Sequence, residues 1–183
     1  MTHVIVARWR PRDGQIEKIE AILRELAEKV RQEPGNLQFV VQRSHVRATM
    51  ESKFWGAWRV ARAAEIRAGG SLTLVTGYFS IRPRPGAAIV GAVNGALESL
   101  TRGLALELAP VRVNAVSPGT IDTPIRSSMP EAARSDMLAK AAAALPVGRV
   151  GVGEDIAAQI LTFMTVGFAT GSIVYIDGGA LII

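Results

Sequence analysis

Small polar residues follow a hydrophobic run in the second half of the chain. The run at 111–116 has the β-branched, apolar composition of a buried strand, and Ser117-Pro118-Gly119 interrupts it. Thr120, Asp122 and Thr123 come directly afterwards. Because open α/β sheets bind ligands outside the carboxyl ends of their strands, we expect this turn to lie beside a small-molecule site.

The remaining chemistry-bearing residues exclude several kinds of site. The chain contains no cysteine, and its histidines are His3 and His45, without metal-ligand spacing, so we expect no metal centre. The net charge of +5 includes a pair at Arg82 and Arg84. We interpret the arginines mainly as solvated side chains and alternatively as an anion site, and no aromatic-interleaved motif favours nucleic acid.

Alternating helices and strands must position these residues. Leucines and valines at 93, 97, 100, 104 and 108 share one helical face, and Pro110 ends that helix. Further helices are predicted at 48–67, 129–144 and 155–166, and strands at 72–75 and 172–176, whereas the proline-containing loop 77–85 cannot be regular. This order predicts an α/β fold with a Rossmann-like partial parallel sheet flanked by helices.

The first 46 residues predict a separate β-α-β unit that joins this sheet. A strand at 4–8 precedes an amphipathic helix at 15–32, and a Pro-Gly turn leads to a strand at 37–43. This opening resembles antibiotic-biosynthesis monooxygenase-like domains, of which it would supply the first half of a barrel. We therefore divide the chain into units 1–46 and 47–183.

The unit at 47–183 resembles the C-terminal part of the short-chain dehydrogenase/reductase family. The resemblance rests on Asn94-Gly95-Ala96-Leu97-Glu98 and on the turn at 118–123. It also includes Leu145-Pro146-Val147-Gly148-Arg149 and Asp177-Gly178-Gly179. This resemblance implies an oxidoreductase that uses NAD or NADP.

The resemblance also implies roles for particular residues. The Tyr and Lys that serve proton transfer in the family fall at Val90 and Asn94, and the Ser that polarises the carbonyl falls at Thr76 or Gly77. Thr76 is therefore the candidate catalytic residue. The nicotinamide-contacting residues would be Pro118, Gly119, Ile121 and Thr123.

Two departures from the family pattern predict weak or degenerate activity. Valine has no proton to give, and the Asn94 amide carries no charge that would lower a neighbouring pKa. No Gly-x-Gly-x-x-Gly or related phosphate loop occurs in the sequence, so we expect NAD or NADP to bind weakly. Tyr78 and Lys53 are a candidate replacement pair, which we consider less favoured than a surface aromatic and a solvated charge.

The sequence leaves open whether the chain is an enzyme, and two alternatives belong to other classes. One is a non-catalytic interaction protein that forms a homo-oligomer through helices 48–67 and 92–108. The other is a cofactor-less monooxygenase-like binder of small molecules. We expect a cytoplasmic protein without membrane spans, because no run is long and apolar enough to cross a bilayer and no secretion signal opens the sequence.

Overall fold

The computed structural model describes residues 46–124 and 129–183. The predicted strands at 4–8 and 37–43 and the predicted helix at 15–32 lie outside the described residues, as do all but the last residue of the unit 1–46. The predicted division into two units, and the monooxygenase-like character of the first, therefore stay predictions.

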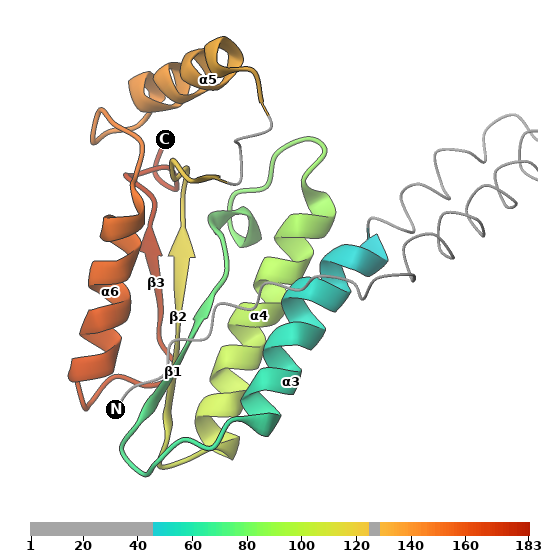
Figure 1. The fold of residues 1–183 in the computed structure, drawn as a ribbon, viewed down its shortest axis with the longest axis vertical. Helices are drawn as coiled ribbons and strands as arrows, with labels where there is room; N and C mark the ends of the chain where they lie inside the picture. Colours follow the sequence, from blue (N-terminus) through green and yellow to red (C-terminus); the bar gives the residue numbers. More distant parts are fainter. Residues whose placement is uncertain (1–45, 125–128) are drawn as a thin grey trace, which may run out of the picture.

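A parallel sheet forms the centre of the described structure (Figure 1). Its strands are β1 (Ser71–Val75), β2 (Arg112–Pro118) and β3 (Ile173–Ile176), side by side in that order. Leu72 pairs with Val113, and Val116 pairs with Val174. The strands predicted at 72–75, 111–116 and 172–176 are confirmed with small shifts of their ends, and so is the predicted fold class.

Helix α4 (Ala88–Glu107) packs on β2 through the face that the spacing predicted. Val93, Leu97 and Leu104 are buried there. The helix begins at Ala88, because the turn at 83–86, with its two prolines and a glycine, stops regular structure immediately before it and alanine favours the helical state. This start places position 90 on the first turn of α4.

The predicted helix 48–67 forms two shorter elements. A π-helical turn, η1 (Met50–Trp55), continues into α3 (Gly56–Ala63). The prediction was wrong about the last four residues, because Ala64 is extended and its N–H donates to the Val60 carbonyl at 2.9 Å. The extended backbone then leads the chain into β1.

Side-chain alternation along the strands gives the sheet two different faces. Leu72 and Leu74 of β1 and Val113 and Ala115 of β2 form an apolar core cluster with residues of α3 and α4. Arg112 points to the opposite face, where Nη1 donates to the Phe163 carbonyl of α6 (Gly153–Thr165) at 2.6 Å. Helices therefore cover both faces of the sheet.

The loops that follow the strands meet at one end of the molecule. The short 3-10 helix η2 (Tyr78–Ser80) lies in the loop after β1, within the stretch predicted to be irregular. Helix α5 (Glu131–Ala144) lies across the carboxyl end of the sheet (Figure 1). Among the described helices, none combines the length and apolarity needed to span a membrane.

Candidate functional site

The turn after β2 is fixed by its contact with the turn after β3. The Gly119 N–H donates to the Ile176 carbonyl at 2.9 Å. A Cβ added at Gly119 would lie 2.6 Å from the Cα of Asp177, which is closer than carbon atoms approach without a backbone shift. The glycine is therefore required by packing, whatever ligand binds nearby.

A second set of contacts fixes the rest of this turn. Ile121 forms a parallel bridge with Gly151, whose N–H donates to the Thr120 carbonyl at 3.0 Å. The Asp122 N–H in turn donates to the Gly151 carbonyl at 2.8 Å. The sheet edge is thus extended by one short pairing beyond the end of β2.

An ion pair supports the segment that carries Gly151. The Arg149 guanidinium binds both carboxylate oxygens of Asp155 at 2.7 and 2.8 Å, and the Val152 N–H donates to the same carboxylate at 2.8 Å. These contacts hold the pKa of the Asp155 carboxyl well below its usual range. The ion pair thus fixes the segment 149–152 to the start of α6, and the backbone hydrogen bonds of Gly151 join that segment to the turn after β2.

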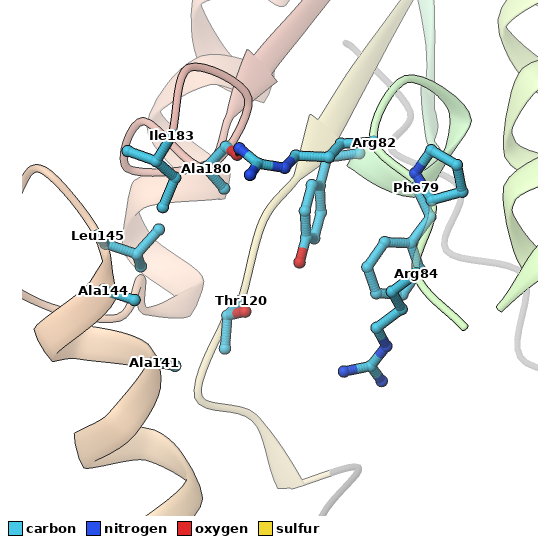
Figure 2. Close-up of a pocket in the computed structure, with 11 residues that line it drawn as sticks. Phe79, Arg82, Arg84, Thr120, Ala141, Ala144, Leu145, Ala180 and Ile183 are labelled. Carbon is cyan, nitrogen blue, oxygen red and sulfur yellow. The ribbon is translucent and has the colours of Figure 1, made fainter. Parts of the chain in front are cut away.

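A cavity of about 320 Å³ lies beyond the carboxyl ends of the strands (Figure 2). One wall carries aromatic and basic side chains of the loop after β1, and the other carries small and aliphatic side chains of α5 and the C-terminal segment. Thr120 lies between them. The lining residues are Tyr78, Phe79, Arg82, Pro83, Arg84, Thr120, Ala141, Ala144, Leu145, Ala180 and Ile183.

The arginines of this cavity are held in position by neighbouring groups. Arg82 Nη1 donates to the Ala180 carbonyl at 2.8 Å. The Arg84 guanidinium lies over the Phe79 ring, with its carbon 5.0 Å from the ring centroid. Arg82 and Arg84, which the sequence analysis gave as an alternative anion site, therefore lie in the wall of this cavity.

The predicted site residues lie around this cavity but do not line it. Thr76 is 6% exposed, and its hydroxyl donates to the Val116 carbonyl at 3.5 Å, at the long end of hydrogen-bond distances. Pro118, Gly119 and Ile121 form the turn itself. Thr123 lines a second cavity of about 320 Å³ together with Asp122, Pro124 and Arg134.

Sequence reasoning placed Thr120 in the turn beside the expected site but gave it no role, and it missed the lining residues from α5 and the C-terminal segment. Thr120 is the residue of the turn that lines the cavity beyond the strand ends, hereafter the main cavity, although the resemblance pointed to its neighbours. Ala141 and Ala144 carry no signal in the sequence, because two alanines in an Ala-rich helix are expected on any face. Only the packing of α5 across the strand ends brings them there.

The residues that the resemblance aligns with the family's Tyr and Lys both lie on α4, and Lys53 of η1 contacts one of them. Val90 is half-buried on the first turn of α4, and Asn94 is 1% exposed one turn later. Lys53 Nζ donates to the Asn94 Oδ1 at 3.1 Å, and burial lowers the pKa of the Lys53 ammonium. A Cβ at Gly77 would lie 2.8 Å from the Asn94 Nδ2, so the amide fills the space beneath that glycine.

A buried carboxylate connects the loop after β1 to the sheet. Glu98 of α4 is 5% exposed and accepts hydrogen bonds from Ser80 Oγ at 2.5 Å and the Tyr175 hydroxyl at 3.1 Å. Burial and the Glu98 charge raise the pKa of Tyr175. These bonds hold η2, and with it the aromatic wall of the cavity, against α4 and β3.

The described residues contain no group of histidines and acids that could hold a metal ion. His3 and His45 both lie outside them. Between Tyr78 and Lys53, the predicted replacement pair, no hydrogen bond occurs in the described part of the chain: Lys53 binds Asn94, and Tyr78 lines the cavity.

Comparisons with known proteins agree with this arrangement of sheet and loops. A family model described as enoyl-(acyl carrier protein) reductase matches residues 16–180. The short-chain dehydrogenase/reductase ATR9 of Stachybotrys chlorohalonatus is 40% identical over 112 residues, which cover 61% of this chain and 44% of that protein. The 3-oxoacyl-[acyl-carrier-protein] reductase FabG of Thermotoga maritima is 36% identical, with 62% and 46% covered. This chain thus spans less than half the length of either relative.

Solved structures with the same fold include a cofactor complex. A small-chain dehydrogenase in complex with NADPH has a TM-score of 0.71 and 37% identity, with 75% of this chain and 64% of that chain covered. The MalC reductase/Diels–Alderase of Malbranchea aurantiaca has a TM-score of 0.68 and 30% identity, with 74% and 54% covered.

Proposed function

This chain belongs to the short-chain dehydrogenase/reductase family of oxidoreductases, and within that family we propose a weakly active member. It binds a small organic molecule in the cavity beyond β1–β3, and it transfers hydride to or from NAD or NADP only slowly. The observation that carries this proposal is the pair of side chains at positions 90 and 94 of α4.

Neither of these side chains can serve proton transfer. The reduction of a carbonyl needs a proton donor beside the developing alkoxide, and a well-placed general acid contributes about 10²-fold to 10⁴-fold in rate. Val90 has no ionisable or hydroxyl group. The Asn94 amide is neutral and already accepts a hydrogen bond from Lys53. The positive charge that the family places on α4 thus lies on η1 in this chain.

Of the two groups that could replace the missing donor, one is engaged elsewhere and the other lacks its proposed partner. The Thr76 hydroxyl is buried and donates to a strand carbonyl. Tyr78 lines the cavity without a hydrogen bond to Lys53 in the described structure, so the pair does not form there. Residual activity would depend on water, or on a Thr76 hydroxyl that exchanges the Val116 carbonyl for the substrate carbonyl.

The described residues fit one part of a dinucleotide better than the rest. The turn at 118–123 lies at the carboxyl end of β2, where the nicotinamide would lie, and Pro118, Gly119, Ile121 and Thr123 are the residues that would hold it. When bound, the cofactor supplies the hydride. The sequence offers no glycine-rich loop for the pyrophosphate, which supports weak binding. The NADPH complex of a similar structure supports the cofactor class.

A binding titration tests the cofactor part of this proposal. NADPH and NADH are added to the purified chain, and binding is followed by calorimetry and by tryptophan fluorescence. We expect dissociation constants of about 100 µM or weaker, and ADP-ribose should bind no better than free nicotinamide mononucleotide. A dissociation constant near 1 µM, about −8 kcal/mol, would show that the phosphates are held after all.

The alternatives drawn from the sequence gain no support from the described structure. Homo-oligomer formation through helices 48–67 and 92–108 stays a prediction, and light scattering tests it directly. A monodisperse monomer at micromolar concentration would contradict it. The monooxygenase-like alternative depends on residues outside the described ranges.

A further inference from the structure

The basic wall of the main cavity faces no acidic side chain among the described lining residues. Arg82 and Arg84 both line it, and no aspartate or glutamate is among the lining residues. Within residues 46–124 and 129–183, no ion pair joins either arginine to a carboxylate. Each guanidinium therefore brings to the cavity a positive charge that no ion pair within the described residues neutralises.

Arg82 is oriented by a contact that leaves most of its hydrogen-bond donors available. Nη1 donates to the Ala180 carbonyl, a neutral acceptor, across the cavity mouth (Figure 2). A guanidinium carries several N–H donors in a planar fork, and one carbonyl cannot use them all. The donors that remain are enough in number to bind both oxygens of a carboxylate.

Arg84 is oriented in a different way with the same consequence. Its guanidinium stacks on the face of the Phe79 ring at 5.0 Å. Stacking uses the π-face of the guanidinium and leaves its N–H edge free for an anion. Because the ring restricts the side chain, less conformational entropy is lost when a ligand binds.

The opposite wall selects the rest of the ligand. Ala141 and Ala144 of α5, with Leu145 and Ile183, present only aliphatic side chains (Figure 2). A cavity of about 320 Å³ lies at the lower end of the range for small-molecule sites. A highly hydrated polyphosphate would lose water against such a wall without gaining a partner.

We propose that this cavity binds a carboxylate attached to an apolar body, with Arg82 and Arg84 binding the carboxylate and the α5 wall covering the body. The inference rests on the proposed function in one respect, namely that the ligand of this chain occupies the cavity beyond the strand ends. It adds the chemical class of that ligand and the residues that select it.

Calorimetric titration with a matched pair of probes tests this proposal. trans-Cinnamate and cinnamamide have nearly the same shape and differ in charge. We expect the wild-type chain to bind cinnamate at least tenfold more tightly than cinnamamide at low salt. R82Q and R84Q should each reduce the affinity for cinnamate about fivefold to tenfold and leave that for cinnamamide within twofold.

R67Q is the control variant, because Arg67 is exposed and does not line the cavity. It removes the same charge from the chain, so a general electrostatic effect would weaken cinnamate binding equally in all three variants and contradict the proposal. Equal affinity of the wild type for the two probes would also overturn it. The thermal midpoint of each variant is measured first. If R82Q unfolds because its contact with Ala180 is lost, R84Q decides the result.

This experiment can fail independently of the proposed function. Tight NADPH binding or rapid turnover would contradict the weak-oxidoreductase proposal while cinnamate discrimination persists. Loss of discrimination with weak NADPH binding would contradict only the ligand class.

Discussion

The turn at 118–123 and the first turns of α4 both carry positions that matter for chemistry in this family, yet different forces hold their residues. In the turn, Gly119 is required by its contact with Asp177, and the backbone of residues 120–122 pairs with Gly151. On α4, Val90 is half-buried. The packing at this position does not require a tyrosine in the way that the contact with Asp177 requires a glycine. The fold alone can explain the family pattern in the turn.

The difference teaches that sequence resemblance in such a fold reports packing first and chemistry second. Residues that the backbone geometry requires persist in the turn whether or not a cofactor binds. Residues that only the reaction requires can change at little cost to folding, and we infer this for the half-buried Val90. The predictions below test this comparison in order of decreasing effect.

Restoring the proton-transfer residues should produce the largest change. In a triple variant, K53N, V90Y and N94K place a phenol and an amine on α4 and avoid two amines side by side. At a fixed millimolar NADPH concentration, we expect the reduction of a small ketone to accelerate about 10²-fold or more. Absorbance at the nicotinamide band measures the rate.

The matched control replaces V90Y by V90F in the same background, which adds the ring without the hydroxyl. An equal acceleration by the phenylalanine variant would mean that ring packing, and not proton donation, changed the rate. No acceleration in either variant would contradict the role that we give to these two positions.

Alanine substitutions at two glycines should have opposite effects on stability. The glycine in the turn is required by close packing, whereas the glycine in α4 only adds backbone freedom to a helix. Gly119→Ala places a methyl group against the Asp177 backbone and should destabilise the fold by about 1–3 kcal/mol, as overpacked sites do. Gly103→Ala, inside α4 with nothing within 4 Å of its added Cβ, should stabilise it by about 0.5–1 kcal/mol. Urea denaturation measures both, and effects of the same sign would refute the comparison.

Much of the fold followed from the sequence, because its signals are local. The leucine and valine spacing predicted the buried face of α4, and the apolar runs predicted the three strands. The change from η1 to α3 was not predictable, because the Gly56 at that point does not indicate a π-helical turn before it. The end of α3 at Ala63 depends on how the chain enters β1.

The candidate site was less predictable, because its walls come from segments far apart in sequence. Tyr78, Arg82 and Arg84 could be noted as unusual loop residues, but nothing in the sequence placed Ala141 or Ile183 opposite them. The hydrogen bond between Lys53 and Asn94 likewise joins residues 41 positions apart. Such contacts depend on how η1 packs against α4.

Removal of the Asn94 amide should have an intermediate effect. Asn94→Leu keeps the volume but deprives the partly buried Lys53 ammonium of its acceptor, which should cost about 1–3 kcal/mol of folding stability. The double variant K53M/N94L removes both polar groups and should be more stable than Asn94→Leu alone. Additive losses in this double-mutant cycle would show that the two side chains do not interact.

The pH dependence of stability should give the smallest effect. Burial lowers the folded-state pKa of Lys53 below its ordinary value of 10.5. Between the folded and the ordinary pKa the unfolded chain binds more protons, so this group makes stability rise with pH in that window. Below the window the penalty for burying the ammonium is present in full and does not change with pH. Thermal unfolding from pH 8 to 10.5 should show a shallower rise in K53M than in the wild type. Identical slopes would mean that Lys53 is solvated.

The most direct test of the weak-oxidoreductase proposal follows the hydride itself. The wild-type chain is incubated with millimolar NADPH deuterated at the transferred position and with a panel of ketones and aldehydes, and mass spectrometry detects deuterium in the alcohol products. We predict turnover at least 10²-fold below the roughly 10 s⁻¹ that is typical of enzymes. Deuterium transfer at about 1 s⁻¹ or faster for any substrate would contradict the account. Such a rate would require a general acid of ordinary efficiency, and Val90 and Asn94 provide none.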